Sequence, residues 1–190
     1  MLLSAGAEPA RELPQGTLDT LDWAWWTPDG ERVVFRGWEK DRSERSYILQ
    51  PPDGQPRPIA PEGTWCWVPG QAWAPCFRHE DKDRRSPVWE LRSLDGGETR
   101  PAPWLGQRDI PYAWSPDGRH AFVAEFVGPG VRVFRVEVAT GRREPWLDPS
   151  PPDPTGVEGF TIGALTPDGR YYAYSYTRTL SDLFLVEGLR

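Results

Sequence analysis

Residues 26–30 read Trp-Thr-Pro-Asp-Gly, and related turns return as Trp-Ser-Pro-Asp-Gly at 114–118 and Leu-Thr-Pro-Asp-Gly at 165–169. A fourth copy that lacks the Asp, Trp-Val-Pro-Gly, occupies 67–70. The shared Pro stands at 28, 69, 116 and 167, which gives steps of 41, 47 and 51 residues. Pro fixes φ at the second position of such a turn, Asp binds nearby backbone amides and Gly closes the turn. The residues that we expect to set strand register are Pro28, Asp29, Gly30, Pro116, Asp117, Gly118, Pro167, Asp168 and Gly169.

Alternating apolar stretches flank each copy of the turn, as at 23–26 and 32–35, and indicate two strands joined in a hairpin. A second turn follows 23 to 26 residues later, at 52–54, 94–97 and 139–141. A third strand precedes this second turn, and a short strand that contains Pro follows it. Pro within a sheet is confined to edges, so the fourth strand is expected at the outer rim.

Four strands in a repeat of about 40 to 50 residues are typical of β-propeller blades. The composition agrees, because 22 Pro, 19 Gly and 11 Trp among 190 residues favour many turns and an aromatic core. We therefore predict an all-β fold, a β-propeller of four-stranded antiparallel sheets, complete or partial. One domain, 1–190, is expected to hold repeats at approximately 15–60, 61–105, 106–147 and 155–190, with 1–14 as a rim strand of a preceding or closing blade.

The charge and hydropathy of the chain argue against two classes of partner. The formal net charge is −6, whereas a nucleic-acid-binding domain usually presents a basic face. No apolar run reaches the 18 residues that a membrane helix needs, and the first residues do not have the pattern of a signal peptide. We expect no nucleic acid and no membrane contact by this chain itself, and the sequence leaves its localisation unknown.

Residues suited to catalysis or metal binding are few. Only two histidines occur, His79 and His120, and no Gly-x-Ser-x-Gly nucleophile motif is present. Turn chemistry accounts for the repeated Asp residues. We therefore predict no enzyme activity, no catalytic residue, no cofactor and no metal. Cys66 and Cys76 flank one hairpin turn, so a disulfide is geometrically possible, although buried free thiols are the favoured interpretation.

The tryptophans allow two interpretations. Trp23 and Trp25 share one side of a regular strand, as do Trp65 and Trp67. Packing between blades is the first interpretation. The second is an aromatic recognition surface at a mouth of the propeller, framed by the charged loop 79–85 and the Pro-rich loop 148–154. The candidate binding residues are Trp23, Trp25, Trp65, Trp67, His79, Arg84 and Arg85.

The segment from about residue 112 onward carries the most specific motifs. It includes Ala-Thr-Gly-Arg-Arg-Glu-Pro-Trp at 139–146, Pro-Pro-Asp-Pro-Thr-Gly-Val at 151–157 and Leu-Thr-Pro-Asp-Gly-Arg-Tyr-Tyr-Ala-Tyr-Ser-Tyr at 165–176. Leu-Ser-Asp-Leu-Phe-Leu-Val-Glu-Gly-Leu-Arg follows at 180–190. This sequence resembles the C-terminal TolB-like, WD-repeat-like propellers that follow the kinase domain in bacterial eukaryotic-type serine/threonine protein kinases.

The resemblance implies a sensor or interaction module that binds a protein partner or small ligand, on the extracytoplasmic side if it is attached to a membrane kinase. The kinase's lysine and two aspartates have no counterparts here, so kinase activity is not implied. A hydrolase or lyase domain on a propeller and an inactive gene fragment are the alternatives. The resemblance also favours an open arc, whose blade edges allow self-association, over a ring closed by pairing 2–13 with a strand at 183–186.

Overall fold

The computed structural model describes residues 12–79, 87–127 and 130–181, apart from the side chains of residues 79 and 87. These residues form fourteen β-strands and no helix, so the described part of the chain holds no helix that could span a membrane. Consecutive strands pair antiparallel in groups that we call blades 1 to 4. The all-β propeller predicted from the turn repeat is confirmed, as a partial propeller.

The strands fall into the blades in chain order. Blade 1 contains β1 (Leu18–Trp26), β2 (Val33–Glu39), β3 (Arg45–Leu49) and β4 (Arg57–Pro58), and blade 2 contains β5 (Thr64–Cys66), β6 (Trp73–His79), β7 (Pro87–Ser93) and β8 (Thr99–Pro101). Blade 3 contains β9 (Asp109–Trp114), β10 (His120–Val127), β11 (Gly130–Glu137) and β12 (Arg143–Leu147), and blade 4 contributes β13 (Val157–Leu165) and β14 (Tyr172–Arg178). The strands β4, β8 and β12 are the rim strands, and each contains Pro as the sequence predicted.

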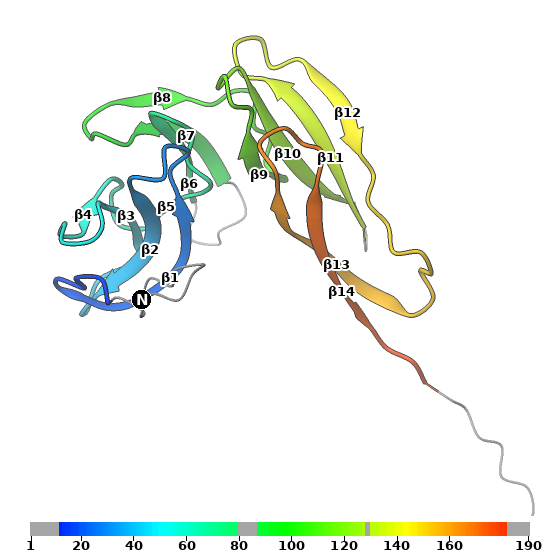
Figure 1. The fold of residues 1–190 in the computed structure, drawn as a ribbon, viewed down its shortest axis with the longest axis horizontal. Helices are drawn as coiled ribbons and strands as arrows, with labels where there is room; N and C mark the ends of the chain where they lie inside the picture. Colours follow the sequence, from blue (N-terminus) through cyan, green and yellow to red (C-terminus); the bar gives the residue numbers. More distant parts are fainter. Residues whose placement is uncertain (1–11, 80–86, 128–129, 182–190) are drawn as a thin grey trace, which may run out of the picture.

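The described blades form an open arc, in which blades 1 and 2 lie together and blade 3 lies beside the hairpin of blade 4 (Figure 1). A single parallel bridge, Arg45 with Thr64, joins blade 1 to blade 2. The ring-closing pairing of 2–13 with 183–186 lies almost entirely outside the described residues. So do the strand expected at 183–186 and the greater part of the predicted rim strand 1–14.

Apolar layers between successive blades form the core. Alternation along each strand sends one set of side chains to each neighbouring blade. Val34 and Ile48 of blade 1 therefore meet Ala74 and Leu94 of blade 2. Two further layers join blade 2 to blade 3 and blade 3 to blade 4. The opposite face of blade 1 carries its own buried cluster, against which Leu13 packs.

The repeated turns have one geometry. In each, the Ser or Thr before Pro donates its hydroxyl hydrogen to the Asp carboxylate and accepts a hydrogen bond from the backbone amide of the second residue after Gly, which is Arg32, His120 or Tyr171. The pairs are Thr27 with Asp29, Ser115 with Asp117 (2.6 Å) and Thr166 with Asp168 (2.6 Å). Gly30, Gly118 and Gly169 have φ of 72°, 67° and 68°, the left-handed region that Gly adopts without strain. The sequence did not assign a role to the Ser or Thr, which completes the turn.

These hydrogen bonds predict a loss of stability in acid. The hydroxyl of Thr27, Ser115 or Thr166, and then a backbone amide, lower the pKa of Asp29, Asp117 and Asp168. A lowered folded-state pKa contributes stability that is present above the unfolded pKa, about 3.9, and is lost as pH falls through the folded pKa. Urea melts at pH 6 and pH 2.5 should therefore give a lower midpoint in acid.

The matched variant replaces all three aspartates by asparagine. In this variant, the difference between the urea midpoints at pH 6 and pH 2.5 should be smaller than in the wild type but should not disappear. A residual difference is expected because hydrogen bonds also lower the pKa of Glu39, Glu137 and Asp153. An unchanged difference between wild type and variant would contradict a role for the turn aspartates.

The expectation of free thiols is wrong, because Cys66 and Cys76 form a disulfide. The register of the hairpin explains this. Cys66 of β5 lies directly opposite Cys76 of β6, with their Cα atoms 3.8 Å apart, so both side chains leave the sheet on the same face. Both residues are nevertheless buried, in the layer between blades 1 and 2. The disulfide thus closes the hairpin that carries Trp65 and Trp67.

Candidate binding surface

A β-bulge on the first strand exposes Trp23. The β1–β2 register shifts between Asp22 and Ala24, and Trp23 lies in this irregular step with φ of 44°. This conformation is uncommon for a bulky residue and costs about 1–3 kcal/mol unless the surroundings stabilise it. The side chain remains 60% exposed. Residues with a strained backbone concentrate at functional sites, so the conformation of Trp23 makes this region a candidate binding surface.

Six aromatic side chains form a continuous run of ring contacts, which we call the aromatic surface. Its members are Trp23, Trp25, Trp65, Trp67, Phe77 and Trp89. The ring centroid of Trp67 lies 6.1 Å from Trp23, 5.3 Å from Trp25 and 6.4 Å from Phe77. Phe77 in turn lies 4.9 Å from Trp65 and 5.0 Å from Trp89. The run thus crosses from blade 1 to the third strand of blade 2.

Charged side chains hold Trp65 in place. The guanidinium of Arg36 lies 4.1 Å from the Trp65 ring centroid, an attractive arrangement of a cation with an aromatic face. Arg36 also donates two hydrogen bonds to Asp22, at 2.7 and 2.5 Å. The indole nitrogen of Trp65 donates to Glu44 Oε1 at 3.1 Å. The acid partner of Arg36 therefore balances its charge beside the rings.

A cavity of about 310 Å³ opens between blade 2 and the loop that enters blade 3. Trp65, Trp67, Phe77 and Trp89 line one side, and residues 107–110 line the other. Trp89 donates its indole hydrogen to the carbonyl oxygen of Gly106 at 3.0 Å, which fixes the loop against the rings. This volume lies at the low end of known ligand sites.

Asp109 and Arg108 give this cavity its charge. Asp109 is only 3% exposed and pairs with Arg143 at 2.8 Å. The backbone amide of Gly106 also donates to Asp109, at 2.5 Å. Arg108 is exposed at the cavity.

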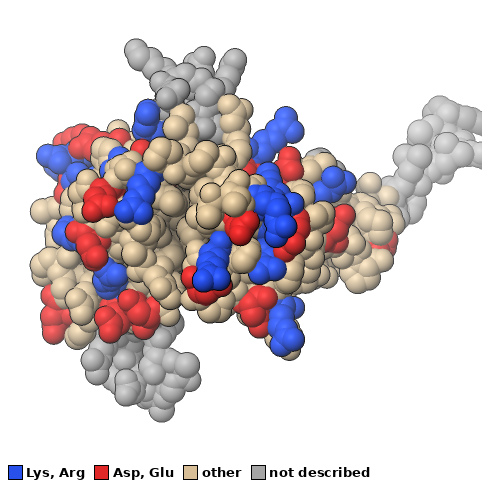
Figure 2. All heavy atoms as spheres, turned by 90° about the horizontal axis from the view of Figure 1, so that it is seen from above, with Lys and Arg blue, Asp and Glu red and all other residues tan. Residues whose placement is uncertain are grey.

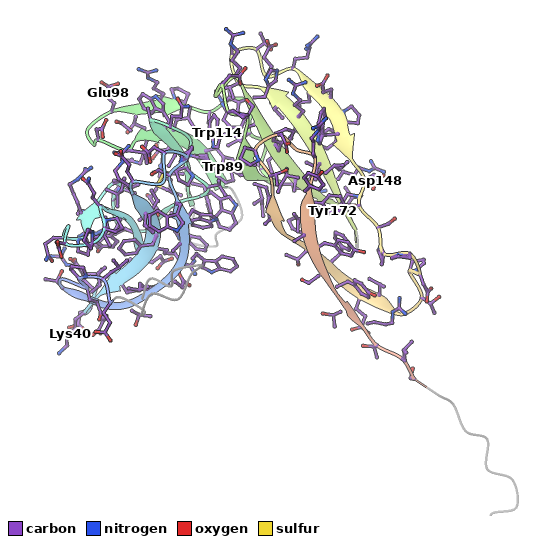
Figure 3. All side chains as sticks on the ribbon, viewed as in Figure 1. Lys40, Trp89, Glu98, Trp114, Asp148 and Tyr172 are labelled. Carbon is purple, nitrogen blue, oxygen red and sulfur yellow. A yellow bond between two sulfur atoms is a disulfide. The ribbon has the colours of Figure 1, made fainter. Side chains whose placement is uncertain are left out.

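Other tryptophans pack between blades, as the first interpretation expected. Trp104 and Trp114 meet edge to face at 5.7 Å and join the layer between blades 2 and 3. The Trp114 indole nitrogen donates to the Val68 carbonyl at 3.1 Å and so connects blade 3 to the turn at 67–70 of blade 2, the copy that lacks the Asp. Figure 3 places Trp89 and Trp114 on the sides of blades 2 and 3 that face each other.

The structure brings together the four tryptophans named from sequence and adds two rings. Phe77 and Trp89 were missed because they join the run through strand pairing: Phe77 lies opposite Trp65 in the pairing of β5 with β6, and Trp89 lies opposite Phe77 in the pairing of β6 with β7. Phe77 stands two residues after Pro75, and Trp89 stands two residues before Leu91, so each pair shares one face of its strand. This spacing is the sequence signal that could have found the two rings. The side chain of His79 and both Arg84 and Arg85 lie outside the described residues.

The turn residues gather around a second cavity, which shares no lining residue with the one beside Trp89. The four Pro residues that mark the repeats, Pro28, Pro69, Pro116 and Pro167, line one cavity of about 170 Å³ with Trp26, Tyr112 and Trp114. Burial raises the pKa of the Tyr112 hydroxyl above its usual value. These turns therefore converge on one point, as the first hairpins of successive blades must.

No group of three or more His, Cys, Asp or Glu side chains that could hold a metal ion occurs among residues 12–79, 87–127 and 130–181. His120 lies beside Arg135, with Nδ1 3.4 Å from Nη2, and the sequence paired it with no nucleophile. Acidic and basic side chains are interspersed over the face shown in Figure 2, without a large patch of one sign. The chemistry that the aromatic surface offers is therefore apolar contact and ring stacking.

Neither the models of known protein families nor the curated proteins include a match to this chain. Among solved structures, TolB from Acinetobacter baumannii superposes with a TM-score of 0.53 at 15% identity, over 85% of this chain and 44% of TolB. A protein from Agrobacterium tumefaciens described as a TolB gives 0.51 at 15% identity, over 82% of this chain and 53% of that one.

A structure from a study of two prolyl endopeptidases is also similar, with a TM-score of 0.53 at 14% identity, over 85% of this chain and 27% of the peptidase. This chain therefore spans about half, or less, of the length of each of these proteins. Identities this low reflect a shared arrangement of blades. The fold of this chain is a TolB-like β-propeller, present in part.

Proposed function

We propose that this chain is a non-catalytic binding module and that the aromatic surface is where it meets a partner. The observation that carries the proposal is the stacking of an exposed, strained Trp23 on Trp25 and Trp67. A ring held this way offers rigid contact area at little loss of side-chain entropy, which is the property of residues that dominate binding energy. The TolB-like fold supports a binding role.

The biological setting that we propose comes from the sequence. The likeness of residues 112–190 to propellers of bacterial serine/threonine kinases supports a sensor role beside such a kinase. The partner in that setting is a protein or a ligand that regulates the kinase.

An enzyme domain is the second candidate, because the similar structures include prolyl endopeptidases. A propeller accompanies many chemistries, so fold alone does not decide between the two. The absence of turnover is part of our proposal. Hydrolysis of a generic peptide or ester panel by the isolated chain, lost in a His120→Ala variant, would favour the enzyme.

The binding proposal is tested by selecting a random heptapeptide display library on the wild-type chain and measuring enriched peptides by fluorescence polarisation. Trp23→Gly is the test variant, because Gly adopts the φ of 44° without strain. We expect it to weaken binding about 30-fold, as loss of a dominant contact does, with unfolding free energy within about 1 kcal/mol of wild type. Tyr171→Ala, which removes another exposed aromatic ring, is the control and should bind normally.

Two outcomes would contradict the proposal. One is a library that yields no enriched peptide on the folded chain. The other is a set of peptides that binds wild type and Trp23→Gly equally, since the contact would then lie elsewhere.

A further inference from the structure

We infer that the aromatic surface binds an extended peptide segment with apolar side chains at alternate positions and an acidic residue at one end. The inference rests on the proposed binding function and names the ligand of that same surface. Three observations carry it: the spacing of the rings, the size of the cavity beside them, and the charge at its rim.

The rings are spaced for an extended chain. Going from Trp23 through Trp67 and Phe77 to Trp89, successive centroids are 6.1, 6.4 and 5.0 Å apart. In an extended strand, side chains on one face recur every second residue, about 6.6 Å apart. In a polyproline II helix they recur every third residue, about 9 Å apart. Alternate side chains of an extended segment can therefore each contact one ring of the run.

The cavity size distinguishes an extended segment from a helix. An α-helix with its side chains is about 10–12 Å across and would need a wide groove. The cavity lined by Trp65, Trp67, Phe77 and Trp89 holds only about 310 Å³ and is bounded opposite by residues 107–110. It accommodates one or two apolar side chains of a ligand, which anchor the segment while the remainder lies along Trp67 and Trp23.

The charges at the two ends of the run differ. Arg36, whose guanidinium lies over the Trp65 ring, is paired with Asp22, the residue before Trp23. At the cavity, Arg108 is exposed and has no charged partner within the described part of the chain, while neighbouring Asp109 is paired with Arg143. The uncompensated positive charge therefore lies at the cavity end. An acidic residue just beyond the anchoring side chain of the ligand would meet Arg108.

The test uses two synthetic peptides of identical composition, labelled with fluorescein at the N-terminus. The alternating peptide is Leu-Ser-Leu-Ser-Phe-Ser-Glu, and the permuted peptide is Ser-Ser-Ser-Leu-Leu-Phe-Glu. Binding is measured by polarisation with the full chain, at low and high salt. We expect the alternating peptide to bind at least tenfold more tightly, and Trp23→Gly and Trp67→Ala each to weaken it at least tenfold.

The charge is tested with Arg108→Gln. This variant should weaken the alternating peptide about threefold to tenfold, should reduce the salt dependence, and should not change binding of a peptide with Gln in place of Glu. Arg119→Gln, on an exposed turn of blade 3, removes the same charge elsewhere and should have no effect. If Arg108→Gln and Arg119→Gln weaken peptide binding equally, the inference that the ligand carries an acidic residue at one end is wrong.

Failure of the inference is distinguishable from failure of the binding function. If both peptides bind equally and both depend on Trp23, the surface binds ligands but does not select apolar side chains at alternate positions, and the inference is wrong while the binding function stands. If neither peptide binds at millimolar concentration, the inference is overturned, and the display selection reports separately on the binding function. Near-ultraviolet circular dichroism of each variant establishes that the propeller is folded.

Discussion

Replacing Gly169 by alanine is expected to lower the free energy of unfolding by about 3 kcal/mol or more. Gly169 has φ of 68°, which costs an L-residue about 1–2 kcal/mol. An added Cβ would also lie 2.6 Å from the Phe122 ring and from Trp146 Nε1. These two side chains cannot both retreat easily, because the Trp146 indole donates to the Gly169 carbonyl at 2.9 Å. The substitution therefore disturbs the contact between blades 3 and 4.

Gly118→Ala is the matched control for this prediction. Gly118 occupies the same place in its own turn with φ of 67°, but an added Cβ there meets no atom within 4 Å. It should cost only the conformational strain, about 1–2 kcal/mol. Urea melts of both variants measure the difference. Equal losses would mean that the contact with Phe122 and Trp146 relaxes at no cost.

Replacing Arg143 by methionine should cost about 3 kcal/mol, because it leaves the carboxylate of Asp109 buried without its cation. Asp109 would retain the amide of Gly106 as a hydrogen-bond donor, which does not compensate a full charge. Arg142→Met is the control, since its side chain is exposed and its contact with Glu137 is 4.0 Å long; it should cost less than about 0.5 kcal/mol.

A double variant separates the two causes of this loss. Arg143→Met combined with Asp109→Asn removes the buried charge as well as its partner, so it should be more stable than Arg143→Met alone. Chemical denaturation of the four members of the cycle gives the coupling energy. A double variant whose losses simply add would show that Arg143 acts through its packing on the Phe134 ring, 5.0 Å away.

Local chemistry made the turns and blades predictable from sequence. Pro, Asp and Gly act within four residues, so their recurrence at 28–30, 116–118 and 167–169 needs no knowledge of distant contacts. The grouping of Trp23 with Trp25 was predicted from a regular strand. The rings do meet, but through a bulge that sequence periodicity does not reveal.

Contacts that depend on the register of paired strands, or on how neighbouring blades stack, could not be predicted from the sequence. The disulfide depends on Cys66 standing opposite Cys76, and a shift of one residue in the hairpin would have sent the thiols to opposite faces. The cavity wall at 107–110 belongs to the next blade, and its place beside Trp89 follows from how blades stack. The sequence pattern of the repeat that contains Trp89 does not predict which residues of the following repeat will line the cavity beside it.

The apolar layers between successive blades make the described fold nearly one-dimensional in its energetics. The layers join blade 1 with 2, 2 with 3, and 3 with 4. In such arrays stability is a sum of unit terms and nearest-neighbour terms, so perturbations decay along the array. A ligand on the aromatic surface touches blades 1 and 2 and the loop entering blade 3, and it would raise amide-exchange protection most in those units. Apart from the meeting of the repeated turns at one cavity, the hairpin β13–β14 would sense it through blade 3, which makes that hairpin an internal reference for the strength of coupling along the chain.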